Sequence, residues 1–510
     1  MLNQIDALFK LWTDHPGAGG QLLVTHKGKV IVDRCYGYAN IETQTPMTQD
    51  SIFHVASISK PITAMAILIL HDQGKLSVYD DVRKYVPDLI GFSEPLTIKQ
   101  MMNHVSGMRC HYGLMFLQGR GSEDCVLHSE VLRLIKRQKN LNFQPGEEFM
   151  YSNPNYALMA TIVERISGMS FAQFCKKEIF EPLGMQNSFI RDNPRTIVPG
   201  KVSSYYCNGY GYTNAIVHLT MYGSTGLNTT CRDLTKFMQH YQNPTLISRK
   251  TLEEICFDVP EVKKGTTIYG GGLRFQDLLG HRVIHHGGVN GGYRTFGALF
   301  PDDDLVVTIF TNTPAIPIET AGRDVARIVL GLPPRKLKDL ESYRAPAPEL
   351  DNLPGMYICD TNKDYIFIDV KDGTVYCDGT PLVHKGDNIY QQGWLNISYA
   401  MGENIVCNQN NSIREYRKFE PRKISEDLAQ QYIGSYYADE CQALWHITCE
   451  DGMLYWNHMR HGSFPMYWMD GDSFLCGSRQ IRFTRNAEGK VDGYLYTVDQ
   501  IRDLPFEKVK

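Results

Sequence analysis

Ser57 and Lys60 open an apolar segment at a spacing that lets them act on each other. On one turn of helix, residues three apart share a face, so the Lys60 amine can reach the Ser57 hydroxyl. A serine hydroxyl is a poor nucleophile at neutral pH, and a lysine whose pKa is lowered by burial or by a cation can activate it. The helix entrance would also favour an oxyanion. The spacing therefore predicts a nucleophilic serine, and the alternative is a capped helix with an exposed lysine.

Tyr151 and Asn153 form a second polar pair, on a loop over residues 145–156 that is rich in turn formers. The loop delivers both side chains just ahead of an expected helix over residues 156–166. A phenol and an amide held toward one cleft could transfer a proton and donate a hydrogen bond. The alternative is an ordinary turn in which Asn153 shapes the backbone and Tyr151 only packs.

His285 and His286 precede a glycine-rich stretch that leads into expected strands over residues 295–300 and 305–310. Glycine lets a substrate or another backbone come close, and an N–H on such a strand edge can donate to an oxyanion. The alternative is a glycine-rich hairpin with incidental histidines.

The composition excludes several classes of partner. The chain has 510 residues, of which 43% are hydrophobic, and a formal net charge of -4 at pH 7. That is enough for several domains with ordinary cores. Without a long Lys/Arg block, a nucleic acid or a membrane surface is not an expected partner. The longest apolar run, residues 62–70, is about half of what a membrane-spanning helix needs.

The first ten residues are typical of an amphipathic helix and not of a signal peptide. Thirteen cysteines show no metal-ligand spacing, which favours reduced thiols and a cytoplasmic location. The expected partner is a small-molecule or short-peptide substrate, no metal or cofactor is called for, and a homodimer is left open.

The chain divides at a segment rich in proline and charge over residues 332–348, which predicts a linker. Beyond it, a pattern that begins at Gly355 recurs 79 residues later at Gly434, with short alternating strands in both copies. Each copy is predicted to form a small antiparallel barrel. The expected domains are residues 1–335, 336–425 and 426–510.

Taken in order, Ser57-x-x-Lys60, Tyr151-x-Asn153 and His286-x-Gly288 resemble the motifs of serine hydrolases that include class C β-lactamases, DD-peptidases and related esterases. The resemblance runs from about residue 17 to residue 330. With the two barrels, the layout is similar to the three-domain D-aminopeptidases. It implies an α+β fold, in which a β-lactamase/DD-peptidase-like domain of antiparallel sheet and helices is followed by two lipocalin-like barrels.

The resemblance implies that Ser57 attacks a carbonyl, that Lys60 and Tyr151 share the proton transfer, and that Asn153 steadies the substrate or Lys60. His286 takes the place of a β-lactamase lysine.

The resemblance also implies an oxyanion hole, made by the Ser57 N–H and a second N–H after the histidine. That second group belongs to Val289 if the motif begins at His286, and to Gly288 if it begins at His285. In the D-aminopeptidases an acidic residue of the last barrel reads the substrate amine, and Asp470 and Asp472 are the candidates here. Both are also typical hairpin-turn residues.

Three functions compete. The first is a D-aminopeptidase or D-amino-acid amidase, which the third domain and the histidine motif favour. The second is a DD-carboxypeptidase or carboxylesterase with weak or no β-lactamase activity. The third is a non-catalytic penicillin- or ligand-binding protein, against which the presence of every motif position counts.

Overall fold

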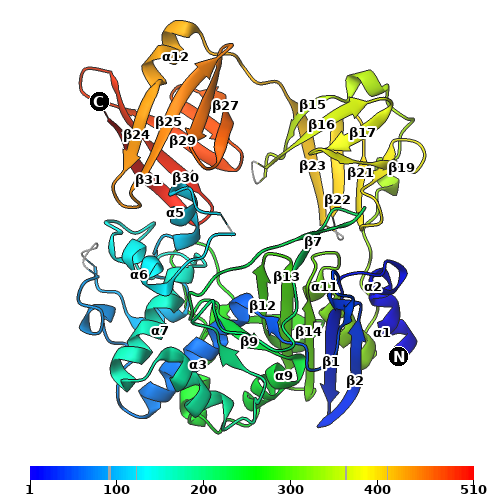
Figure 1. Cartoon of the computed structure of the whole chain (residues 1–510), viewed down its shortest axis with the longest axis vertical. Helices are drawn as coiled ribbons and strands as arrows, with labels where there is room; N and C mark the ends of the chain where they lie inside the picture. Colours follow the sequence, from blue (N-terminus) through cyan, green and yellow to red (C-terminus); the bar gives the residue numbers. More distant parts are fainter. Residues whose placement is uncertain (90–93, 122, 362–363, 410–411, 510) are drawn as a thin grey trace. The chain divides into compact units, whose positions relative to one another are not determined.

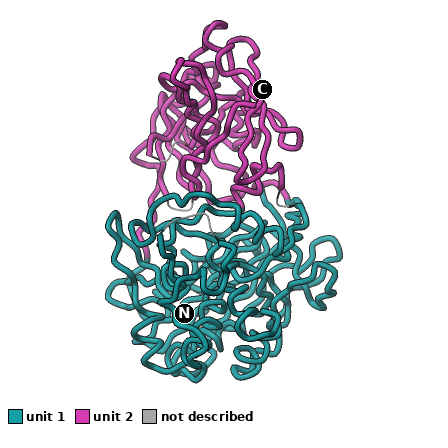
Figure 2. Tube along the Cα trace, turned by 90° about the vertical axis from the view of Figure 1, so that its left-hand side faces the viewer, with its two compact units in different colours: residues 1–111, 121–207, 212–334 teal, residues 112–120, 208–211, 335–510 magenta. Residues whose placement is uncertain are grey.

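The computed structural model describes residues 1–89, 94–121, 123–361, 364–409 and 412–509. The chain divides into two compact units, coloured separately in Figure 2. Unit 1 comprises residues 1–111, 121–207 and 212–334, and unit 2 comprises residues 112–120, 208–211 and 335–510. The main division lies between residues 334 and 335, and two short segments of the earlier chain belong to the later unit.

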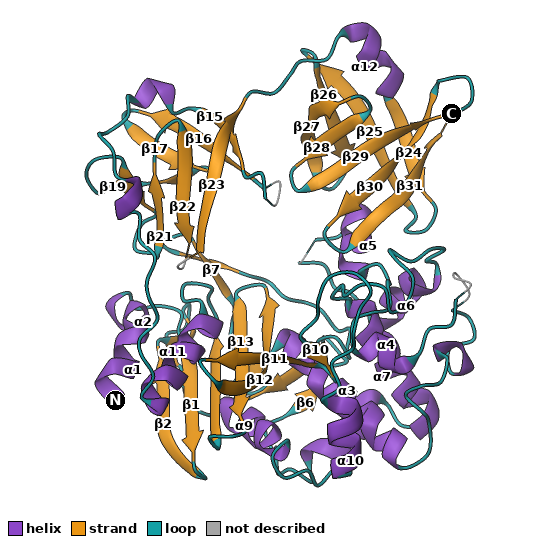
Figure 3. Cartoon of the chain, turned by 180° about the vertical axis from the view of Figure 1, so that it is seen from behind, coloured by secondary structure: helices purple, strands orange, loops and turns teal. Residues whose placement is uncertain are grey.

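An antiparallel sheet of seven strands forms the centre of unit 1 (Figure 3). The strand order β10-β11-β12-β13-β14-β1-β2 places the first hairpin of the chain beside the last strand of the unit. The hairpin expected near the amino terminus is present, with Gly20 opposite Tyr36 and His26 opposite Lys29. The strands are β1 (Gly20–His26), β2 (Lys29–Tyr36), β10 (Tyr269–Gly270), β11 (Leu273–Leu278), β12 (His281–Asn290), β13 (Tyr293–Phe300) and β14 (Leu305–Thr311).

Helices cover both faces of this sheet. Phe296 of β13 packs against Gly322, whereas the next residue, Gly297, faces Leu234. Successive side chains of a strand point to opposite faces, so the helices that carry these two contacts lie on opposite sides. They are α11 (Ile318–Leu330) and α9 (Cys231–His240). The expected amino-terminal helix is broken at Phe9 into α1 (Leu2–Leu8) and α2 (Lys10–Asp14), which share the core on the α11 side.

A layer of helices flanks the sheet, with α3 (Ser59–Asp72) at its centre (Figure 1). Every residue of α3 from Ser59 to Leu70 is buried, which explains why this helix is apolar on nearly every face. Gly74 follows with a left-handed φ of +68°, as expected for a helix stop. Helix α3 packs against α7 (Asn153–Ser167), which in turn contacts α4 (Ile98–Met102), α6 (His128–Lys136) and α8 (Phe171–Cys175).

Two antiparallel β structures make up most of unit 2, as predicted. The first is a nearly closed sheet of nine strands in the order β18-β17-β16-β15-β23-β22-β21-β20-β19. Its strands are β15 (Gly355–Ile358), β16 (Tyr365–Lys371), β17 (Thr374–Cys377), β18 (Thr380–Pro381), β19 (Val383–His384), β20 (Ile389–Gln391), β21 (Ile397–Ala400), β22 (Asn404–Gln409) and β23 (Ser412–Phe419). A small apolar cluster that contains Met356, Ile358, Tyr467 and Leu475 joins this sheet to the second structure.

The second structure is a closed barrel of eight strands, in which β31 pairs with β24. Helix α12 (Glu426–Tyr432) precedes it. The strands are β24 (Gly434–Ala438), β25 (Ala443–Glu450), β26 (Met453–His458), β27 (Gly462–Asp470), β28 (Ser473–Cys476), β29 (Arg479–Arg485), β30 (Val491–Val498) and β31 (Ile501–Val509).

The sequence repeat is also a structural repeat. Gly355 begins β15 and Gly434 begins β24, with φ values of 142° and 151°. Asp372 and Asp451, which turn the second hairpin of each copy, have φ values of 50° and 49°. The two copies therefore share backbone conformation at equivalent positions, and they differ in closure.

Two segments from the earlier part of the chain pack within unit 2. Residues 112–120, which include most of α5 (His111–Leu117), lie against the closed barrel: Trp445 Nε1 donates to Leu117 O at 2.8 Å, and Phe116 stacks on His461 at 4.3 Å. In the second segment, the Trp394 N–H donates to Gly209 O at 3.2 Å. No sequence motif indicated these contacts. None of the helices in the described ranges is long and apolar enough to cross a membrane.

Candidate active site

Ser57 sits on a short 3-10 turn, Ala56–Ile58, directly before α3. Ala56 has a φ of +48°, a conformation that is uncommon outside glycine and that recurs at functional sites. Thr295 Oγ1 donates to Val55 O at 2.9 Å, and a Cβ on Gly288 would lie 2.3 Å from the same oxygen. Only glycine at position 288 lets the backbone come this close to Val55 O, so the turn that carries Ser57 packs directly against β12 and β13.

Lys60 is fully buried and its Nζ has three oxygen neighbours. The Nζ lies 3.0 Å from Ser57 Oγ, 2.8 Å from Asn153 Oδ1 and 2.9 Å from Ser224 O. The carbonyl and amide oxygens can only accept, so they take two N–H groups. A neutral amine has two N–H groups and one lone pair, and the lone pair is then left facing the Ser57 hydroxyl.

The surroundings favour the neutral forms of Lys60 and Tyr151. Burial holds the pKa of the Lys60 amine well below its ordinary value, and the Arg274 guanidinium acts in the same direction. Burial raises the pKa of the Tyr151 phenol, although a hydrogen bond with Ser57 opposes this rise. A neutral Tyr151 can therefore donate to Ser57 Oγ while the serine proton faces Lys60.

Asn153 and Tyr151 are held by the entrance of α7 and by a buried histidine. Asn153 is the first residue of α7, whereas the sequence placed it just ahead of the helix. The ring of His104 lies 4.3 Å from the Tyr151 ring, and His104 Nδ1 accepts from the Ser152 N–H at 3.0 Å. This contact fixes the plane of the phenol beside Lys60, whose Nζ lies 4.6 Å from the ring centre.

The two adjacent histidines of β12 point to opposite faces of the sheet. His286 lies on the side of Tyr151, with the ring centroids 6.2 Å apart. His285 packs against Phe296, and its Nε2 lies 3.0 Å from Gln276 Oε1. The geometry thus favours the register in which His286 begins the motif.

Val289 presents its N–H at an open part of the β12 edge. Asn290 and Tyr293 close a hairpin with a two-residue loop, so they exchange both backbone bonds, and the Val289 N–H points away from β13. On that other side, the pairing of β12 with β11 ends at His285 opposite Arg274. The exposed Val289 can therefore offer its N–H to a ligand.

Tyr269 and Arg274 belong to this site, and sequence reasoning missed both. The Tyr269 hydroxyl lies 3.0 Å from His286 Nε2. The Arg274 guanidinium lies 5.9 Å from the ring centres of both Tyr151 and Tyr269, and within the described chain no carboxylate pairs with it. Neither residue stands in a motif, because both reach the site only through the pairing of β10 and β11 with β12.

Comparison with known proteins matches residues 6–330 to the family described as Beta-lactamase. The chain belongs to the beta-lactamase family. Penicillin-binding protein 4* of Bacillus subtilis is 30% identical over 327 residues, which cover 60% of this chain and 71% of that protein. A D-aminopeptidase of Brucella anthropi is 22% identical over 520 residues, which cover 98% of this chain and 96% of that protein. Two other D-aminopeptidases align over 60% of their own length.

Among solved structures, an octameric penicillin-binding protein homologue from Pyrococcus abyssi superimposes with a TM-score of 0.60 at 21% identity. The match covers 94% of this chain and 97% of that one. It supports the fold of this beta-lactamase family member from the catalytic region through the barrels. The expected α+β fold is thereby confirmed, and the family match together with the D-aminopeptidase relatives confirms the resemblance to the β-lactamase-type hydrolases.

Asp470 and Asp472 lie in the closed barrel, at the turn between β27 and β28. The Asp472 carboxylate is bound by Arg485 at 2.8 Å and by the Tyr432 hydroxyl at 2.7 Å, and the Arg485 contact lowers the pKa of Asp472. Asp470 is exposed at the end of β27. An amine would therefore have to compete with Arg485 for Asp472, whereas Asp470 is the more available of the two carboxylates.

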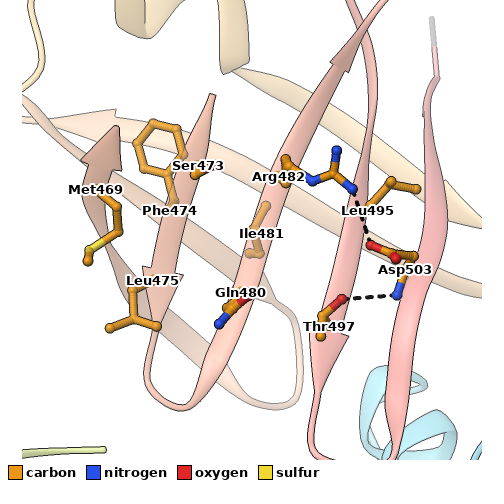
Figure 4. Close-up of a pocket in the computed structure, with 10 residues that line it drawn as sticks. All are labelled: Met469, Ser473, Phe474, Leu475, Gln480, Ile481, Arg482, Leu495, Thr497 and Asp503. Atoms are coloured by element: carbon orange, nitrogen blue, oxygen red, sulfur yellow. Dashed lines mark hydrogen bonds and ion pairs between the residues drawn. The ribbon is translucent and has the colours of Figure 1, made fainter. Parts of the chain in front are cut away.

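A separate hollow of about 230 Å³ lies on the closed barrel (Figure 4). Leu475, Gln480 and Thr497 are among its lining residues, and the charges of Arg482 and Asp503 already pair with each other at 3.3 Å. Among the described residues, its lining includes Ser473 but no lysine. In the ranges that the structure describes, no group of three His, Cys, Asp or Glu residues is arranged to hold a metal ion.

Proposed function

We propose that this family member is a hydrolase of small amides or peptides that works through an acyl-enzyme on Ser57. The observation that carries the proposal is the environment of Lys60 Nζ, which lies 3.0 Å from Ser57 Oγ and contacts two oxygens that can only accept. In the neutral amine these two oxygens take both N–H groups, and the lone pair is left for the Ser57 hydroxyl. A buried amine with a lowered pKa beside a serine hydroxyl is the arrangement that nucleophilic catalysis requires.

The first half of the reaction forms the acyl-enzyme. Ser57 Oγ attacks the substrate carbonyl as its proton passes to Lys60 Nζ. The N–H groups of Ser57 and Val289 bind the oxyanion that develops. When the tetrahedral intermediate collapses, the bond to the leaving nitrogen breaks, and Tyr151 gives its proton to that nitrogen and recovers one from Lys60.

The second half reverses these proton movements with water. A water molecule loses a proton to Tyr151 or Lys60 and attacks the acyl carbonyl, and Ser57 leaves with a proton returned by the same pair. Because Lys60 and Tyr151 exchange one proton, the pH profile reports the pair and not either residue alone. Asn153 keeps the amine of Lys60 aimed at Ser57 throughout.

For the substrate, we propose amides or short peptides with a free amino-terminal D-residue. The similarity to the D-aminopeptidase of Brucella anthropi supports this choice because it extends through the barrels. An acidic group must then pair with the substrate ammonium, and Asp470 and Asp472 remain the candidates. Asp470→Asn and Asp472→Asn should be compared on a free amine and on its N-acylated analogue. If neither variant changes the ratio of kcat/KM for the free amine to kcat/KM for the N-acylated analogue, the closed barrel does not select for the free amine.

The test of the proposed function is a hydrolysis screen of the full-length protein. Its substrates are D-alanyl and L-alanyl amides, short acyl esters, a peptide ending in D-Ala-D-Ala and a chromogenic cephalosporin. We expect the D-alanyl amide to be preferred, with all turnover lost in Ser57→Ala. Turnover of the L-amide alone, or turnover that survives Ser57→Ala, would contradict the proposal.

A second candidate function, carboxypeptidase action on a substrate with a free carboxylate, is favoured by Arg274. This guanidinium faces the site without a carboxylate partner among the described residues, and Arg is suited to bind a carboxylate through two hydrogen bonds. In the same screen, a preference for the D-Ala-D-Ala peptide over its carboxamide, lost in Arg274→Gln, would establish this alternative.

A further inference from the structure

Both ring nitrogens of His286 are engaged inside the protein. Nδ1 lies 2.6 Å from Gly287 O, and Nε2 lies 3.0 Å from the Tyr269 hydroxyl. A carbonyl oxygen carries no hydrogen, so Nδ1 must hold the proton of that bond. In the neutral imidazole Nε2 is then an acceptor, and the Tyr269 O–H donates to it.

Charges around the ring favour this neutral state. Burial lowers the pKa of His286, and Lys60 on α3, Arg274 on β11 and the neighbouring His285 act in the same direction, whereas the bond to Gly287 O opposes them. The remaining neighbours are the phenols of Tyr151 and Tyr269 and the ring of His104, none of which supplies a negative charge. The carboxylate of Glu319 on α11 lies beside Gly287, on the face of β12 opposite His286.

The Gly287 carbonyl matters because it points away from β13, toward the part of the β12 edge that β11 leaves open, whereas Gly288 pairs with Thr295. The bond from His286 Nδ1–H satisfies this carbonyl, which the ladder leaves unpaired. Val289, whose N–H also faces the open strand edge, follows Gly288. Tyr269 therefore acts on the strand edge through His286.

We propose that Tyr269 is a positioning residue: its hydroxyl donates to Nε2 of a neutral, Nδ1-protonated His286, and so holds the ring that bonds Gly287 O on the β12 edge beside the Val289 N–H. The inference deepens the proposed function and rests on it for its catalytic consequence. In this arrangement Arg274 carries the positive charge of the site, and Lys60 adds a second positive charge only when it is protonated. His286 then differs in charge from the β-lactamase lysine whose place it takes.

The test uses full-length protein labelled with 15N-histidine, with the His286 signals assigned by their loss in His286→Gln. We expect the Nδ1-protonated neutral tautomer in the wild-type protein, unchanged between about pH 5 and pH 9. Tyr269→Phe keeps the ring, removes the donor to Nε2, and should shift the 15N signal of the unprotonated Nε2. With the strand edge loosened, kcat should fall about tenfold at nearly constant KM, the pattern of an interaction made in the transition state.

The matched control is Tyr241→Phe, which removes another buried hydroxyl, one that has no hydrogen-bond partner among the described residues. It should leave the Nε2 signal and the kinetics unchanged. A wild-type His286 that is protonated at Nε2 or titrates as a cation in this range overturns the proposal, as does a Tyr269→Phe spectrum identical to wild type. The spectra need no substrate, so they test the positioning role even if the proposed reaction proves wrong.

Discussion

A lysine lies over a tyrosine ring in the catalytic unit and at equivalent positions of the two barrels, and the three places allow a comparison. The pairs are Lys60 with Tyr151, Lys418 with Tyr357 and Lys508 with Tyr436, at 4.6, 5.9 and 5.6 Å from Nζ to the ring centre. The contact alone therefore carries no information about catalysis.

The three lysines differ in burial and in the hydrogen-bonding groups that surround their Nζ atoms. In the barrels, Lys418 Nζ donates to Asn352 O at 2.8 Å and Lys508 Nζ donates to Gln431 O at 2.9 Å, and Lys418 is exposed. Lys60 is fully buried and faces a hydroxyl as well as two acceptors. The difference shows that removal from water, combined with a reactive hydroxyl, separates a candidate base from a structural lysine.

The largest expected effect comes from removing the hydroxyl that distinguishes the Lys60 site. Ser57→Ala should lower turnover on the order of a millionfold, because the nucleophile acts in a unit with its base. Steady-state kinetics on the preferred substrate and labelling with a fluorophosphonate probe measure this effect. A variant that folds normally yet keeps its turnover, with contaminating enzyme excluded, would show that Ser57 is not the nucleophile.

The next largest effect on kcat is expected at Tyr151 and not at the tyrosines that lie under the barrel lysines. Tyr151→Phe should reduce kcat by about 10² to 10⁴, because a general acid and base is lost while the ring stays in place. Tyr436→Phe removes a barrel hydroxyl that donates to Tyr432 O, and it should leave kcat unchanged. Near-normal turnover by a well-folded Tyr151→Phe protein would mean that Tyr151 only packs.

The parts of this site that could be predicted from sequence are local. Ser57 and Lys60 share one helix entrance, and Tyr151 and Asn153 share one loop, so their spacing already encodes their approach. The barrel repeat was equally visible, because the glycine at the start of each copy needs its unusual φ.

Tyr269 and Arg274 could not be predicted in this way. They reach the site through the register of β10 and β11 against β12, and long-range pairing leaves no local signature. The same reason applies to closure of the barrels, since whether β31 meets β24 depends on residues at opposite ends of a domain. The break at Phe9 likewise follows from tertiary packing, because the rings of Phe9, Trp12 and Tyr36 all contact one another.

A smaller effect is expected on the pH dependence of kcat/KM, which should depend on the buried Lys60 and not on the barrel lysines. Lys60 must be neutral to accept the serine proton, so kcat/KM should fall as pH drops through the apparent pKa of the coupled Lys60 and Tyr151 pair. Burial lowers the pKa of Lys60, Cys110 opposes this, and Arg274 lowers it further. Arg274→Met removes one cation, the Lys60 pKa rises, and the acid limb of the profile should move to higher pH.

Two variants serve as controls for this shift. Arg274→Lys keeps the charge and should hold the acid limb close to its original place. Arg323→Met removes a cation that lies beside His285 and donates to Gln276, on the other face of β12, and should not move the limb. An acid limb that stays in place in Arg274→Met would show that Lys60 does not control it.

The smallest effect belongs to the barrel lysines. Lys508→Met removes the bond to Gln431 O, which ties the last strand to the end of α12, and should destabilise that corner by about 1 kcal/mol. Because a chain with several domains need not unfold in two states, the measurement is amide hydrogen exchange over residues 431–438. Lys418→Met, at the equivalent but more exposed position, should have a smaller effect on its own barrel. Neither substitution should change kcat. A loss of kcat in Lys508→Met without faster exchange would mean that this lysine contributes to the reaction, and the distinction drawn from burial would fail.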